Sequence, residues 1–138
     1  MGIDHRLWDE GPATGIAVVD EDHRELVRLY SDLVDTIDRA LGKQALLETL
    51  ERLRASVASH FTHEEAVMTR LGCDDAFLHK QDHDRFVQDL EDFRINIEET
   101  YRAEDWPAIA KYLKYRFIQH GQNYDNRLFE RRRSAGDA

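Results

Sequence analysis

Hydrophobic residues recur every three or four positions along four long stretches of the chain, a spacing typical of amphipathic helices. The first two stretches predict helices over about residues 20–41 and 44–71. Gly42 and Gly72 follow these stretches directly, and glycine is the residue that most often ends a helix. We therefore expect one helix to stop at each glycine.

The second half of the chain repeats the pattern and predicts helices over about 75–100 and 105–131. Asp105 followed by Pro107 is a typical helix start, because an acidic cap and an early proline both suit the first turn. Four helices joined by short loops predict an all-α fold, an antiparallel up-down-up-down bundle. We expect a single domain over 1–138, with an N-terminal arm at 1–19 and a short basic C-terminal tail.

Composition narrows the class of protein. The 138 residues carry a net charge of −9, so nucleic acid and anionic membrane surfaces are not expected partners. No apolar stretch reaches the roughly 18–20 residues that a membrane span requires. Cys73 is the single cysteine and cannot form an internal disulfide, and the N-terminus does not resemble a secretion signal. We therefore expect a cytoplasmic location.

Polar residues interrupt the apolar stripe of every predicted helix, and seven of them are expected to meet at one end of the bundle. They are His23, His60, Glu64, His79, His83, His120 and Asp125. Two pairs among them are spaced four residues apart, which places both members on one helix face. Burying such a group without a partner costs about 1–3 kcal/mol, so a shared partner must satisfy them. His63 lies outside this pattern and is expected to point away from the core.

Five imidazoles and two carboxylates exceed the four ligands that one tetrahedral zinc takes, and they suit two metals. If the carboxylates and a water-derived oxygen bridge the metals, the histidines divide three and two. One metal then has an open position. A mixed imidazole and carboxylate set is compatible with iron, although manganese and zinc accept the same ligands. An open position in an apolar bundle favours a small diatomic ligand such as O2.

The motifs WDEG, GIAVVDEDHREL, SHFTHEE, HKQDH and HGQNYD together resemble the hemerythrin family, specifically its bacterial single-domain members, over nearly the whole chain. The resemblance implies two iron ions with a bridging oxo or hydroxo group. His79, His83 and His120 would hold the saturated iron, His23 and His60 the iron with the vacant position, and Glu64 and Asp125 would bridge both.

The resemblance further implies reversible O2 binding for storage, delivery or sensing, with NO and azide as other possible ligands, and no enzymatic reaction. A sensory module that reports O2, NO or redox state to an unknown protein partner is one alternative. A di-iron oxidase or peroxidase of the ferritin-like kind is another. The second is weaker, because such sites use Glu-x-x-His pairs and none occurs in this chain.

The ligand pocket is expected to be lined by Leu26, Phe61, Phe117 and Gly121. Two positions depart from the family's usual pattern: Arg116 stands where tryptophan is usual, and Gly121 where a bulky aliphatic is usual. The missing side chain at Gly121 predicts faster ligand access and faster autoxidation. Asp125 lies five residues after His120, so we also predict a π-bulge or widened turn between them.

Overall fold

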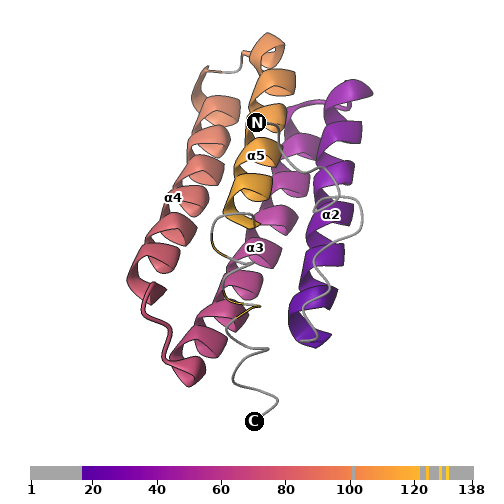
Figure 1. The fold of residues 1–138 in the computed structure, drawn as a ribbon. Helices are drawn as coiled ribbons and strands as arrows, with labels where there is room; N and C mark the ends of the chain where they lie inside the picture. Colours follow the sequence, from indigo (N-terminus) through magenta and orange to yellow (C-terminus); the bar gives the residue numbers. More distant parts are fainter. Residues whose placement is uncertain (1–16, 101, 122–123, 125–127, 129, 131–138) are drawn as a thin grey trace.

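The computed structural model describes residues 17–100, 102–121, 124, 128 and 130. Its α-helices are α2 (Ala17–Asp38), α3 (Lys43–Leu71), α4 (Ala76–Ile95) and α5 (Trp106–His120). Consecutive helices run in opposite directions and pack lengthwise as a bundle (Figure 1). The all-α four-helix bundle predicted from the sequence is confirmed. The first 16 residues of the predicted arm, the basic tail and Asp125 lie outside the described residues.

Helix α2 is shifted relative to its predicted range of 20–41. It begins at Ala17 and ends at Asp38, because Ala40 rather than Gly42 reverses the chain. Ala40 has a left-handed φ of 50°, and its N–H donates to the carbonyl of Ile37 at 3.1 Å. Gly42 instead precedes α3, with a φ of 99°. The predicted stop at Gly42 was therefore wrong, since an alanine accepts the strained turn two residues earlier.

The ends of α3 and α4 and the start of α5 lie close to their predicted positions. Helix α5 itself ends at His120, and the predicted end of the last helix at about 131 lies outside the described residues. Helix α3 ends as predicted, at Gly72 with a left-handed φ of 62°. Helix α4 ends at Ile95, and a π-helical turn (Asn96–Thr100) completes the predicted stretch. A 3-10 turn (Ala103–Asp105) leads into α5, but the Asp105 side chain forms no capping hydrogen bond.

The two ends of the bundle differ in what they bury. At one end each helix contributes a leucine that is at most 2% exposed: Leu33, Leu50, Leu90 and Leu113. The other end holds buried histidines and one buried glutamate, surrounded by aromatic rings. None of the described helices is long and apolar enough to cross a membrane. The fold therefore encloses a polar layer at one end and an apolar core at the other.

Candidate metal centre

Six of the seven predicted metal ligands lie within the described residues, and all six are at most 7% exposed. They are His23 on α2, His60 and Glu64 on α3, His79 and His83 on α4, and His120 at the end of α5. Because α3 and α4 are antiparallel, the end of α3 and the start of α4 meet at the same end of the bundle. Four-residue spacing then turns both ligands of each pair inward.

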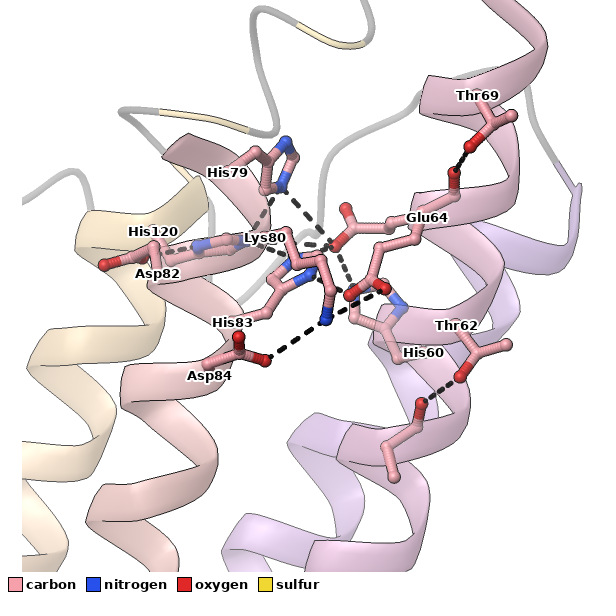
Figure 2. A network of polar contacts seen from close by, with 12 residues as sticks. His60, Thr62, Glu64, Thr69, His79, Lys80, Asp82, His83, Asp84 and His120 are labelled. Carbon is pink, nitrogen blue, oxygen red and sulfur yellow. Dashed lines mark hydrogen bonds and ion pairs between the residues drawn. The ribbon is translucent and has the colours of Figure 1, made fainter. Parts of the chain in front are cut away.

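Four of these residues converge on one point (Figure 2). The Nε2 atom of His120 lies 3.1 Å from Nε2 of His83 and 3.2 Å from Nε2 of His79. Glu64 Oε1 lies 3.1 Å from Nε2 of His83. One ligand atom from each of the four residues lies within 4.8 Å of every other, so the group could hold a metal ion.

The two other described ligands, His60 and His23, lie outside this group of four. Nε2 of His60 is 3.6 Å from Oε1 of Glu64, so His60 borders the group through that carboxylate. His23 is buried beside Phe117, with 5.4 Å between ring centroids, and Phe117 also lies 6.5 Å from the His60 ring. The structure gives His23 no place in the four-residue group.

Two described residues after α5 bear on the predicted widened turn before Asp125. Gly121 and Tyr124 are π-helical, as the predicted widened turn after His120 requires. A π-helical turn places residues five apart on one face, whereas an α-helix separates them. Asp125 itself lies outside the described residues, so its ligand role stays a prediction.

Carboxylates from neighbouring helices bind the outer nitrogens of two histidines and face that of a third. His120 Nδ1 is 2.6 Å from Asp82, and His83 Nδ1 is 2.8 Å from Glu65. Nδ1 of His60 faces Asp22 at 3.5 Å. Metal-bound histidines usually donate their second N–H to such a group, which fixes the tautomer and the ring orientation.

The sequence analysis missed Asp22, Glu65 and Asp82, although each is adjacent in sequence to a predicted ligand. That adjacency was the available signal, because an acid beside an inward ligand lies near the centre. His63 lies outside this set of acids and contacts one of them. It is only half-buried, and its Nδ1 lies 2.6 Å from Asp22. His63 therefore points outward from the centre, as predicted, yet still contacts the Asp22 carboxylate.

Arg116, flagged as a departure from the family pattern, is buried against Asp82. Its guanidinium donates to Asp82 at 3.1 Å, to Gln119 at 3.1 Å and to Asp89 at 3.4 Å. Burial alone would raise the pKa of Asp82, but its hydrogen bonds with His120 and Arg116 and its electrostatic attraction to them lower it to about 2. Asp82 is thus held as an ionised acceptor for His120 Nδ1.

The donor set fits a cation. With Nδ1–H of His83 and His120 donated to carboxylates, each Nε2 carries a lone pair that faces the other imidazole and Glu64 Oε1. Electron-rich atoms at 3.1 Å repel one another unless a positive charge lies among them. Glu64 Oε2 is buried and forms no hydrogen bond within the described part of the chain. A metal ion would satisfy all of these atoms together.

The predicted ligand-pocket residues divide into two groups. Leu26 and Phe117 line a small apolar cavity next to the histidine layer. Phe61 instead stacks on the His83 ring, with 3.8 Å between centroids and 8° between planes. Gly121 does not line that cavity, and apart from its chain neighbours and its own helix backbone no described atom lies within 4 Å of where its Cβ would be.

Comparison with known proteins gives several matches. The family model described as the hemerythrin HHE cation binding domain matches residues 14–131. A bacteriohemerythrin of Pseudomonas aeruginosa is 30% identical over 96 residues, which are 68% of this chain and 61% of that protein. The chain thus spans about three fifths of that relative. A comparison with solved structures found no significant match.

Two further relatives cover more of their own length. A myohemerythrin of Theromyzon tessulatum is 32% identical over 101 residues, 72% of this chain and 78% of that protein. A bacteriohemerythrin of Clostridium acetobutylicum is 22% identical over 131 residues, 86% of this chain and 97% of that protein. Because the family model covers most of the chain and the converging histidines lie within its bounds, the chain belongs to the hemerythrin family.

Proposed function

We propose that this protein binds O2 reversibly at a non-haem di-iron centre and acts in oxygen storage, delivery or sensing. The proposed iron ligands are His23, His60, Glu64, His79, His83, His120 and Asp125. The observation that carries the proposal is the convergence of Glu64 Oε1 with three histidine Nε2 atoms inside a bundle of this family. When bound, the irons would supply the electrons for reversible O2 binding.

The contacts support a division of the ligands between two irons. His79, His83 and His120 form one compact group, which suits the iron whose ligand positions are filled. Glu64 Oε1 faces His83 at 3.1 Å and His60 at 3.6 Å, so one carboxylate adjoins both histidine sets. A bridging role for Glu64 is therefore in keeping with its position and with its second oxygen, which forms no hydrogen bond with any residue that the structure describes.

Asymmetric surroundings support a vacant position on the side of His23 and His60. Phe117 lies against both rings, and Leu26 is on the helix turn after His23, so this side is apolar. An apolar environment favours small neutral ligands and disfavours bulk water. O2 and NO are neutral and fit this environment. We extend the proposal to azide as well, an anion that the positive charge of the bound iron would hold.

Metal analysis combined with optical spectra tests the proposal. We expect about two irons per purified chain, because the ligand set exceeds what one metal takes. The reduced protein should gain an oxygenated spectrum in air and lose it under argon, through repeated cycles. Iron without reversible oxygenation, or a single zinc in fully loaded protein, would contradict the proposed function.

A pair of histidine variants separates the ligand layer from its surroundings. His79→Ala removes an imidazole that is 1% exposed and aims at the centre, and we expect iron loading to fall to one atom per chain or fewer. His63→Ala is the matched control, since His63 is half-buried and faces Asp22 rather than the centre. It should retain full iron loading, and equal losses in both variants would refute the ligand assignment.

A further inference from the structure

Arg116 is joined to a proposed iron ligand through a single carboxylate. His120 Nδ1 lies 2.6 Å from Asp82 Oδ2, and the other oxygen of that carboxylate, Oδ1, accepts a hydrogen bond from Arg116 Nη2 at 3.1 Å. The two contacts therefore use different oxygens of the same group. Because both oxygens are bonded, Arg116 fixes the rotation of the carboxylate that His120 faces.

The Arg116 guanidinium is itself held by three groups. Besides its bond to Asp82, Nη1 donates to Gln119 at 3.1 Å and Nε donates to Asp89 at 3.4 Å. The side chains of Arg116 and Asp82 are each only 10% exposed. Arginine stays protonated in proteins, so these contacts hold a permanent positive charge behind the carboxylate that supports His120.

The other two outer acids have different neighbours. Lys80 lies 3.8 Å from Glu65, but the Lys80 side chain is 58% exposed, so water weakens its effect. Asp22 contacts histidines. Within the described part of the chain, Asp82 is thus the one outer acid in contact with an arginine. The buried cation therefore acts on the support of one ligand, His120.

A carboxylate that accepts the Nδ1 proton of an imidazole makes its Nε2 atom a stronger electron donor to a metal. A stronger donor stabilises ferric iron relative to ferrous iron, because the ferric ion carries more positive charge. The cation of Arg116 draws electron density from the Asp82 carboxylate and so weakens this donation. Its charge also repels a ferric ion more than a ferrous one. Both effects favour the ferrous form.

We propose that Arg116 is a positioning residue that acts through Asp82 on His120 and shifts the proposed iron centre towards its ferrous form. The inference rests on the proposed function and deepens it, because the reduced protein is the form that takes up O2. An uncharged residue at this position, such as the tryptophan usual in the family, could not have this effect.

Redox titration of the iron-loaded protein under argon tests the proposal, with the ratio of ferric to ferrous iron read optically at a fixed ambient potential. Arg116→Gln removes the charge but keeps a hydrogen-bond donor, and it should raise this ratio about tenfold, the scale of one hydrogen bond to a charged group. A tenfold change corresponds to about 59 mV for one electron. Arg116→Lys keeps the positive charge and should stay close to the wild-type ratio.

Two further variants complete the set, and guanidinium chloride unfolding checks that each is folded. Arg94→Gln is the matched control and should leave the ratio unchanged, because Arg94 also contacts two carboxylates but lies beyond the leucine end of the bundle. Asp82→Asn should lower the ratio, since a neutral amide accepts the His120 proton more weakly. Adding Arg116→Gln to Asp82→Asn should have little further effect, because the carboxylate through which Arg116 acts is gone.

The hydrogen bond is also measured without iron, in protein loaded with zinc as a diamagnetic substitute that accepts the same ligands. The Nδ1 proton of His120 is followed by ¹H–¹⁵N NMR. Arg116→Gln should move its resonance downfield, because a carboxylate without its cation accepts a stronger hydrogen bond. A purely structural role for Arg116 predicts the opposite, which is a weaker bond and an upfield shift.

Four results would overturn the proposal: a ferric-to-ferrous ratio in Arg116→Gln equal to the wild-type ratio, the same ratio in Arg116→Lys and Arg116→Gln, an equal effect of Arg116→Gln with and without Asp82→Asn, or the upfield shift. If Arg116→Gln does not fold, an unchanged ratio in Asp82→Asn overturns it instead. Neither measurement uses O2, so failure here leaves the proposed O2 binding standing. A failed oxygenation experiment likewise leaves the iron ratios and the zinc spectra interpretable.

Discussion

Removing the Arg116 guanidinium is expected to destabilise the protein strongly. In Arg116→Met a flexible apolar chain replaces the cation, and Asp82 keeps only the hydrogen bond from His120. Both side chains of the pair are 10% exposed, so the lost interaction is largely shielded from water. Breaking a buried pair by removing one partner typically costs 3–5 kcal/mol. Because His120 still donates a hydrogen bond to Asp82, we expect the free energy of unfolding to fall by about 3 kcal/mol, the lower end of that range.

Guanidinium chloride unfolding at neutral pH measures this loss, since a lower midpoint with an unchanged slope reports stability directly. The matched control is Arg94→Met. Arg94 also contacts two carboxylates, Glu91 and Glu98, but it lies at the surface, so its removal should change the midpoint little. A double-mutant cycle with Asp82→Asn should give a coupling energy of about 1–3 kcal/mol.

Two results would refute this reasoning. Equal midpoints for Arg116→Met and the wild-type protein would mean that the buried pair contributes nothing. Additive effects of Arg116→Met and Asp82→Asn would mean that the two residues do not act on each other, despite the 3.1 Å contact.

Three further outcomes are expected. Burial raises the pKa of Tyr30 from 10.0 to about 12. The contribution of the Tyr30 hydroxyl to the free energy of unfolding is therefore intact below pH 10 and is lost as pH rises to 12. Alkaline unfolding should therefore show a loss of about 2–3 kcal/mol that Tyr30→Phe lacks and Tyr112→Phe retains. Gly121→Leu adds the side chain that is missing at this position and should slow autoxidation, followed as loss of the oxygenated band. An unchanged rate would reject the prediction that Gly121 speeds ligand access. Glu65→Gln should speed iron release to a chelator about 10–100-fold by weakening support of His83, and wild-type kinetics would contradict that role.

Much of the bundle could be predicted from the periodicity of hydrophobic residues alone. Both ends of α3 lie within one residue of their predicted positions, because a long apolar stripe and a following glycine both act locally. The end of α2 did not follow, since Ala40 has no local feature that marks it for a left-handed conformation. Local signals identify a helix well, but they do not say which residue will accept strain at its end.

The centre shows the same limit at the level of side chains. The helical repeat of each apolar stripe was enough to select the buried histidines and Glu64, because facing inward depends on one helix only. The outer acids depend on two helices at once. The sequence of α4 does not indicate that Asp82 contacts His120 and Arg116, because both of these residues are on α5. Arg116 could be recognised as unusual, but its partners could not.

The outer acids follow the order of the chain: Asp22 on α2 faces His60 on α3, Glu65 on α3 faces His83 on α4, and Asp82 on α4 faces His120 on α5. At the metal centre, each pair of successive helices is thus linked by an acid from the earlier helix and an imidazole from the later one. A ligand that binds only this assembled state stabilises it by mass action. Metal binding should consequently stabilise all three helix–helix contacts together. Local opening of one of these contacts should release the ion and destabilise the other two.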